Sequence, residues 1–137
     1  KEFIKKAEIE PANGRSIHFA VVDEDDEYLG TVSLKDYDDQ SKCAEYAISL
    51  RKKAQGRGIG KKATEDILKY AFETCGMSRV FLNVLAENQR AIKLYEKCGF
   101  VYEGTFRKHL FLNGRFVDLN WYGILREEYY KIHKSLM

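Results

Sequence analysis

Hydrophobic and polar residues follow two different periods along the chain, and these periods predict strands and helices in turn. Four segments, bounded by polar turns, either alternate apolar with polar residues or form short apolar runs, as β-strands do. These segments are residues 17–22, 28–34, 43–50 and 79–85. The first two flank five consecutive acids, Asp23 to Glu27, and therefore predict a hairpin with an acidic tip.

Apolar residues recur every three and four positions in two further segments, and this spacing predicts helices. The first helix is expected over residues 59–75, and the second is expected up to Cys98 after the N-cap residue Asn88. A glycine follows each segment, as is common where helices end. Because the first helix stands between the strands 43–50 and 79–85, this order indicates a parallel crossover.

The two ends of the chain give simpler signals. Residues 100–112 and 116–125 flank Asn113-Gly114, the strongest short signal for a β-hairpin. Near the other end, residues 2–9 are typical of the end of a helix, closed by the turn-forming run Pro11-Ala12-Asn13-Gly14. The whole pattern therefore indicates a mixed α/β protein.

Length and composition limit the class of protein. The chain has 137 residues, 45% of them apolar, and shows neither linker nor repeat, so we expect residues 1–137 to form one domain. The 23 Lys and Arg nearly balance 21 Asp and Glu, so no global field favours nucleic acid or a membrane as partner. No segment has the apolar length of a spanning helix or signal peptide, and we expect a cytoplasmic protein.

Cysteine and histidine positions indicate no metal and no disulfide scaffold. The three cysteines are an odd number without CxxC spacing, which favours reduced structural thiols. They are Cys43, Cys75 and Cys98. The three histidines lack the spacing of a metal site or catalytic dyad, and we expect structural or exposed roles for them. They are His18, His109 and His133.

A basic, glycine-rich segment lies where strand 43–50 meets the first helix. Residues 51–62 hold six cations and no acid, with glycines at three alternate positions. Glycines let a backbone approach a ligand, and a helix start adds partial positive charge, so the segment predicts a pyrophosphate cradle. Its spacing is neither that of a P-loop nor that of a Rossmann turn. A solvated basic loop and, more weakly, a nucleotide- or RNA-binding loop without interleaved aromatic residues are the alternatives.

The same segment resembles a known family signature. Gln55-Gly56-Arg57-Gly58-Ile59-Gly60 is similar to the Q/R-x-x-G-x-G/A acetyl-CoA motif of the GCN5-related N-acetyltransferases (GNAT). Residues 44–50, 80–84 and 87–100 resemble further core motifs of that family, and residues 113–128 are similar to its ribosomal-protein and amino-sugar branches.

The resemblance implies a fold, and it implies that the N-terminal part of the family's domain is incomplete in this chain. It implies a central mixed, mostly antiparallel sheet flanked by helices and splayed at the acetyl-CoA site, between strands 43–50 and 79–85. Family members usually begin with a strand and two helices, so the chain is expected to lack the N-terminal strand and helix. Part of the acceptor pocket is then expected outside it.

The resemblance also implies which residues bind acetyl-CoA. Backbone amides of residues 56–61 would hold the pyrophosphate, with Arg57 and Lys61 as nearby cations. The end of strand 43–50 would pair its backbone with the pantetheine arm, and one N–H would polarise the thioester carbonyl. The full set is Ile48, Ser49, Leu50, Gln55, Gly56, Arg57, Gly58, Ile59, Gly60, Lys61, Asn88 and Tyr95.

Asn88 and Tyr95 are seven residues apart, so they lie on one helix face within roughly 20°. The resemblance gives Asn88 a pantetheine contact and makes Tyr95 the general acid toward the departing thiolate. The conjugate acid of that thiolate has a pKa of about 8.5, against about 10 for tyrosine. Alternatively, Asn88 is only a cap and Tyr95 a core aromatic, and the two interpretations are compatible.

Glu45 is the candidate base. An acceptor ammonium has a pKa near 10 and must lose a proton before it attacks a carbonyl. Glu45 is the only acid between Asp39 and Glu65, and it stands in an otherwise apolar strand where burial would raise its pKa. The alternative is a glutamate that simply pairs with a lysine.

These residues predict an acetyl-CoA-dependent N-acetyltransferase that moves an acetyl group directly to a primary amine. The acceptor stays open between a protein N-terminus, an amino sugar nucleotide and a polyamine. No acyl-enzyme and no metal are expected, and a homodimer is left open. The alternative is a non-catalytic CoA-binding regulatory module.

Overall fold

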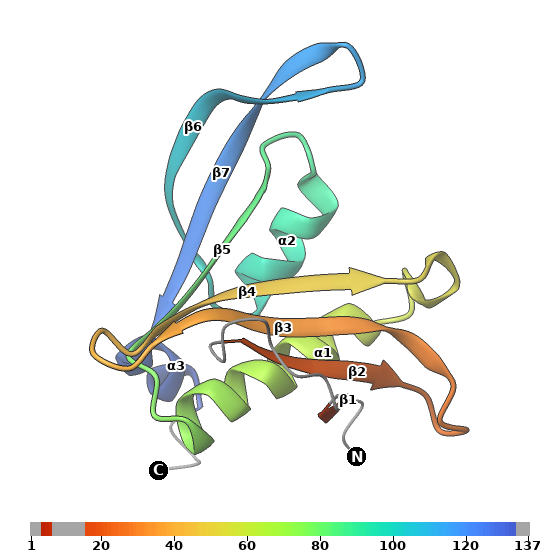
Figure 1. Ribbon diagram of the computed structural model, residues 1–137, viewed down its shortest axis with the longest axis vertical. Helices are drawn as coiled ribbons and strands as arrows, with labels where there is room; N and C mark the ends of the chain where they lie inside the picture. Colours follow the sequence, from red (N-terminus) through yellow and green to blue (C-terminus); the bar gives the residue numbers. More distant parts are fainter. Residues whose placement is uncertain (1–3, 7–15, 134–137) are drawn as a thin grey trace. The chain divides into compact units, whose positions relative to one another are not determined.

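The computed structural model describes residues 4–6 and 16–133 (Figure 1). The chain forms two compact units, the first ending at Val80 and the second beginning at Phe81. No helix of the described residues is long and apolar enough to cross a membrane.

The first unit is built on antiparallel strands in the order β1-β2-β3-β4 (Figure 1). Their bounds are β1 (Ile4–Lys6), β2 (Ile17–Val22), β3 (Tyr28–Asp38) and β4 (Cys43–Leu50). A short 3-10 turn η1 (Lys52–Ala54), helix α1 (Ile59–Lys69) and a π-helical turn η2 (Tyr70–Thr74) follow. The predicted hairpin, the strand 43–50 and the helix after it are confirmed.

Helix α1 packs its apolar face on one side of this sheet. Ala63 and Ile67 of the helix are fully buried, and so are Val32 and Ala44 of the strands. The hydroxyl groups of Tyr46 and Thr64 lie 2.7 Å apart and join β4 to the helix. Because side chains alternate along a strand, Glu45 lies on the opposite face of the sheet from α1.

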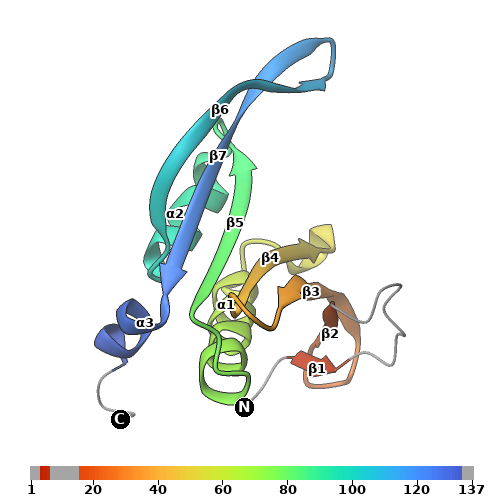
Figure 2. The ribbon, with the colours of Figure 1, turned by 60° about the vertical axis from the view of Figure 1, so that its left-hand side comes forward.

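The described residues of the second unit form three strands and two helices. Strand β5 (Arg79–Leu85) leads into it, and α2 (Gln89–Lys97), β6 (Val101–Leu112), β7 (Arg115–Leu125) and α3 (Arg126–Ile132) follow. The strand order is β5-β7-β6, with β6 and β7 antiparallel (Figure 2). Asn113 and Gly114 at the turn have φ values of 50° and 80°, as the predicted hairpin requires.

Both helices of this unit lie on the same side of β7. A Cβ atom on Gly99, directly after α2, would lie 2.6 Å from the Ile132 side chain of α3 and 3.1 Å from Ile124 of β7. Burial raises the pKa of Tyr122, and the charge of Glu96 on α2 adds to the shift, so α2 also lies near Tyr122 of β7. Tyr122 and Ile124 share one face of β7, and both are buried.

The structure corrects the sequence prediction at both ends. Residues 4–6 form a strand paired with Phe19 to Val21, so the helix predicted over 2–9 is wrong there, since the edge of β2 supplies their backbone partners. The remainder of that helix and the turn at 11–14 lie outside the described residues. Helix α3 was not predicted. The Glu128 carboxylate accepts the Leu125 N–H at 2.9 Å and so caps the helix. The signal in the sequence was the pair of acids in the first turn, Glu127 and Glu128.

Candidate cofactor site

The basic loop is fixed to the β2–β3 hairpin by its own backbone. The Arg51 N–H donates to the Leu29 carbonyl at 2.7 Å, and the Arg51 guanidinium donates to the Tyr28 carbonyl at 3.3 Å. Ala54 is fully buried at the centre of the loop. Beyond Ala54, Gly56 and Gly58 are exposed, whereas Gly60 is buried in the first turn of α1.

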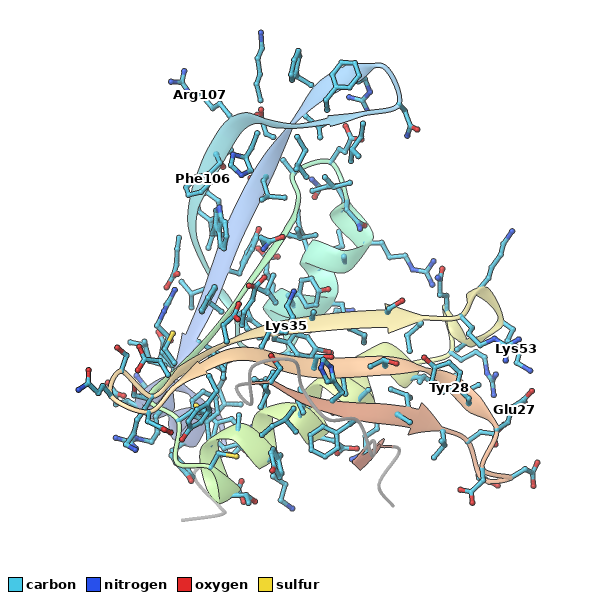
Figure 3. All side chains as sticks on the ribbon, in the orientation of Figure 1. Glu27, Tyr28, Lys35, Lys53, Phe106 and Arg107 are labelled. Atoms are coloured by element: carbon cyan, nitrogen blue, oxygen red, sulfur yellow. The ribbon has the colours of Figure 1, made fainter. Side chains whose placement is uncertain are left out.

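Two of the six cations of the segment face carboxylates of their own unit. The Lys53 ammonium pairs with Glu27 of the acidic hairpin tip (Figure 3), and Lys62 lies 3.4 Å from Asp66. Arg57 and Lys61 are exposed beside the glycines. The positive charge predicted for an anion is therefore present, although Lys53 shares its charge with the acidic tip.

Gly56 and Gly58 give the loop the geometry of an anion cradle. Their φ values are 77° and 75°, a left-handed conformation that favours glycine. Gly58 is the N-cap of α1, and a Cβ atom there would meet no atom within 4 Å. The first hydrogen bond of the helix runs from the Lys62 N–H to the Gly58 carbonyl, so the preceding helical amides have no acceptor within α1. Amides without a helical acceptor, open space beside Gly58 and flanking cations together fit a pyrophosphate group.

The end of β4 is held tightly against β3. Ile48, Ser49 and Leu50 pair with Val32, Thr31 and Gly30 in turn. A Cβ atom on Gly30 would lie 2.2 Å from the Ser49 carbonyl oxygen, so only glycine allows this approach. Sequence reasoning missed Gly30, and its signal was a glycine inside a strand.

Gln55 links the loop back to that strand. Its side-chain amide donates to the Leu50 carbonyl at 3.3 Å. The Leu50 carbonyl has a second lone pair, so a ligand donor can bind it beside the Gln55 amide. Within the first unit, the structure thus brings together all ten of the predicted cofactor residues from Ile48 to Lys61.

In the second unit, Asn88 caps α2 as predicted. Its side-chain oxygen accepts the Ala91 N–H at 3.2 Å. The cap uses only that oxygen, so the amide NH₂ group keeps its donors for another partner. Asn88 is exposed at the start of the helix.

Tyr95 lies half-buried on the same helix. Its ring meets Phe100 edge-on at a centroid distance of 5.9 Å. Burial raises the pKa of the Tyr95 hydroxyl, and Cys98 adds to the shift. Tyr95 is therefore a packed aromatic with a hydroxyl that keeps its proton, and its role as general acid stays a prediction.

Glu45 lies beside a lysine. This is the arrangement expected if Glu45 is an ion-pair partner and not a base. Lys35 is its cross-strand partner, and the Lys35 ammonium lies 3.9 Å from the carboxylate. The same face of the sheet carries His18 and the buried Ser33, whose Nδ1 and Oγ atoms lie 2.6 Å apart. The pattern of the sequence did not single out this polar pair. Whether Glu45 acts as a base stays a prediction.

The described residues contain neither a disulfide nor a cluster of possible metal ligands. Cys43, Cys75 and Cys98 are all free of disulfides, and Cys98 is buried. Among residues 4–6 and 16–133, no cluster of three or more His, Cys, Asp or Glu side chains could hold a metal ion.

Comparison with known proteins places these residues in a family context. A family model described as an acetyltransferase (GNAT) domain matches residues 1–101. The chain is 32% identical over 128 residues to a spermidine N(1)-acetyltransferase of Vibrio cholerae serotype O1, with 89% of this chain and 74% of that protein covered.

Two further relatives are longer than this chain. The spermidine N(1)-acetyltransferase of Escherichia coli (strain K12) is 30% identical over 115 residues, which cover 84% of this chain and 62% of that protein. A protein named as a ribosomal N-acetyltransferase, YdaF of Bacillus subtilis (strain 168), is 31% identical over 105 residues, covering 77% and 57%. The chain thus spans less than two thirds of either protein.

Solved structures show the same likeness. The Vibrio cholerae spermidine N-acetyltransferase in complex with CoA and spermine has a TM-score of 0.83 at 31% identity, with 86% of this chain and 70% of that chain covered. A structure described as dodecameric, of the same enzyme, has a TM-score of 0.82 at 32% identity, with 85% and 68% covered.

Proposed function

Because the chain belongs to the GNAT family of acetyltransferases, we propose that its loop 55–61 binds acetyl-CoA and that the acetyl group passes to a primary amine of a polyamine. The predicted family, the GNAT fold and the class of N-acetyltransferase are confirmed with that membership. The cofactor residues, the acceptor and the activity of the whole protein are proposals.

The conformation of Gly56 and Gly58 carries the proposal. Left-handed glycines at the start of α1, beside Arg57 and Lys61, fit a diphosphate better than a merely solvated basic loop, which needs no such backbone. The polyamine is supported by two relatives named as spermidine acetyltransferases. A protein N-terminal amine is the second candidate, because one relative is named as a ribosomal acetyltransferase.

The residues of the chain would then perform separate tasks. Bound acetyl-CoA supplies an acetyl group activated as a thioester. The amides that open α1 donate to the pyrophosphate, and an N–H of residues 48–50 donates to the thioester carbonyl. The acceptor nitrogen forms the new C–N bond as the C–S bond breaks. Glu45, directly or through water, takes the proton that the amine loses, and the Tyr95 hydroxyl gives one to the sulfur.

Burial of Tyr95 affects this last proton transfer. A raised pKa makes the hydroxyl a weaker acid toward a thiolate whose conjugate acid has a pKa near 8.5 in water. The same burial would also destabilise a charged thiolate and raise the pKa of its thiol. The transfer is therefore best timed with breaking of the C–S bond, before a full charge forms on sulfur.

Turnover with a panel of amines tests the proposal. The full-length protein is assayed for release of free CoA thiol with spermidine, spermine, a peptide with a free N-terminus and an amino sugar nucleotide. We expect release with the polyamines, together with CoA binding by calorimetry. Release with the peptide alone would favour the second candidate, and CoA binding without release for any amine would favour the regulatory module.

We also propose that the protein self-associates. This proposal is supported by the likeness to an enzyme structure described as dodecameric. That likeness does not distinguish the homodimer left open by the sequence from a larger assembly. Sedimentation of the full-length protein tests it directly.

A further inference from the structure

The face of strands β2 to β4 that points away from α1 carries three rows of side chains. In the register of the strands, the rows are Thr31 with Ser49, Ser33 with His18 and Ala47, and Lys35 with Glu45. Because side chains alternate along a strand, all of these lie on one face, while α1 covers the other (Figure 1). The row of Ser33 is therefore the middle one, between the rows of Ser49 and Glu45.

The two outer rows are too far apart for direct proton transfer. A strand rises roughly 3.2–3.4 Å per residue, so Glu45 and Ser49 are about 13 Å apart along β4. In the function proposed above, the thioester carbonyl is bound at residues 48–50, whereas the Glu45 carboxylate lies 3.9 Å from the Lys35 ammonium in its own row. A base takes a proton at about 2.6–3.2 Å, or through one water. Glu45 can thus take a proton from an entering ammonium, but a nitrogen that attacks the thioester needs a nearer group.

Ser33 and His18 form a hydrogen-bonded pair in the middle row. The Ser33 Oγ and His18 Nδ1 atoms lie 2.6 Å apart, Ser33 is 7% exposed, and His18 is half-buried. In a neutral imidazole with its proton on Nε2, the Nδ1 atom accepts the serine hydroxyl proton. Ala47, on the other side of Ser33, has only a methyl group and is itself half-buried. The hydroxyl can therefore be approached over Ala47, directly or by a water molecule.

The fold does not require a buried hydroxyl at Ser33. Strands β2 and β3 are already joined by their backbone pairing. Thr64, the other buried serine or threonine of the described residues, differs in this respect, because its hydroxyl bonds to Tyr46 and to the Gly60 carbonyl and joins the helix to the sheet. Ser33 bonds instead to a histidine, the side chain that changes its charge most readily near neutral pH.

The charges around this pair nearly balance. In the register of the described strands, the charged and titratable groups on this face are Lys35 and Asp38 of β3 and Glu45 and Cys43 of β4, and β1 places Lys5 opposite Ala20. The Lys35 ammonium and the Glu45 carboxylate lie in the row next to His18 and pair with each other. The imidazole can therefore gain a proton without meeting a net positive charge in that row.

Acetylation of a primary ammonium removes two protons from its nitrogen, one before the attack and one as the C–N bond forms. We propose that the Ser33–His18 pair takes the second of these protons, while Glu45 takes the first. The nitrogen gives its proton to Ser33 Oγ, directly or through one water, as the Ser33 hydroxyl proton passes to His18 Nδ1. The imidazolium then loses a proton to solvent. Since Glu45 and His18 release two protons and Tyr95 takes one up again after protonating the sulfur, each turnover releases one proton.

This inference rests on the function proposed above, and two substitutions test it. His18→Gln keeps a side-chain amide beside Ser33 but cannot take up a proton, and Ser33→Ala removes the hydroxyl. Each should lower kcat with the best amine of the panel about 10²-fold or more, with the KM for that amine and the CoA affinity little changed. Because both act on one path, the double variant should be no slower than the slower single variant. Tyr28→Phe is the matched control, since it removes a hydroxyl from the 2.6 Å pair with Thr31 on the same sheet, and it should turn over as the wild type does.

Added imidazole provides a readout that a structural role would not move. The kcat of His18→Ala should rise with the concentration of neutral imidazole, and so with pH over the range in which imidazole loses its proton. A wild-type kcat in His18→Gln and Ser33→Ala would overturn the relay and leave the proposed function standing. A loss of kcat that imidazole does not restore, with a lowered melting temperature, would make the pair structural. A wild type that acetylates no amine would overturn the relay and the proposed function together.

Discussion

Gly58 combines a left-handed backbone with open space beside its α-carbon, and these two properties can be separated by experiment. Gly76 has a φ of 65° and equally open surroundings, but it follows the helix instead of opening it. Alanine should therefore cost about 1–2 kcal/mol of stability at either position, from left-handed strain alone. Only Gly58→Ala should also weaken CoA binding, about tenfold or more by calorimetry, because its methyl group stands where the phosphate approaches.

Equal CoA affinities in the two folded variants would remove Gly58 from the cradle. Thermal denaturation of both variants provides the control, since it reports the strain that they share.

A substitution can remove the hydroxyl group of Tyr95 and keep its aromatic ring. Tyr95→Phe keeps the edge contact with Phe100, so the fold and CoA affinity should change little. If the hydroxyl is the general acid, turnover should fall by about 10²–10⁴-fold. Because burial raises the pKa of Tyr95, the wild-type rate should hold beyond the ordinary pKa of tyrosine before this group limits it. A wild-type rate for Tyr95→Phe in stopped-flow thiol release would make Tyr95 a packing residue only.

Glu45 and Lys35 form a pair in which the two roles of the glutamate can be told apart. Glu45→Gln keeps shape and removes basicity, so a base would lose rate most at low pH and recover as the free amine becomes available. Lys35→Gln breaks the same ion pair and leaves the carboxylate in place. If pairing is all that Glu45 does, both variants should show the same small drop in melting temperature, with unchanged pH–rate profiles.

The acidic hairpin tip, at the scale of an element, is organised by Asp23. Its carboxylate accepts the Glu27 N–H at 2.9 Å and the Asp25 N–H at 2.8 Å. The Glu27 backbone bond is the largest cause that lowers the pKa of Asp23 below its ordinary value. A lowered pKa means that this contribution to the turn is present above about pH 4 and is lost as the pH falls through the folded value.

Carboxyl NMR should therefore show Asp23 titrating below the ordinary aspartate range, and the Glu27 amide signal should move with it. An Asp23 midpoint at the ordinary aspartate value would mean that the turn does not depend on these bonds. Asn at position 23 is the matched variant, since it keeps one acceptor oxygen and removes the titration.

Most elements were predictable from the sequence because each has a local cause. The helix after the basic loop follows from apolar spacing, Asn88 caps as its side chain requires, and Asn113-Gly114 determines its turn. Two elements were not predictable in this way. Residues 4–6 take their strand from pairing with β2, a partner distant in sequence, and α3 is too short to show a periodic face.

For the whole molecule, the sequence predicted the family, the fold and the class of reaction, but less of the site. The loop residues could be proposed as a cofactor site because their chemistry lies within seven consecutive positions, and their role stays a prediction. Gly30 could not, since its importance comes from a carbonyl on the neighbouring strand. The predicted splay between 43–50 and 79–85 and the single domain over 1–137 stay predictions, because residue spacing does not fix how two compact units are placed.

Because Glu27 already pairs with Lys53, the Glu27 carboxylate and a bound phosphate would compete for the Lys53 ammonium. A change of ionic strength should reveal this competition. Salt screens the attraction of phosphate to the loop, but it equally screens the carboxylate that occupies Lys53. CoA affinity of the wild type should therefore fall more gently with added salt than that of Glu27→Gln, in which the lysine is always available to phosphate. Calorimetry of the two proteins across a salt series measures this, and identical slopes would show that Lys53 takes no part in binding.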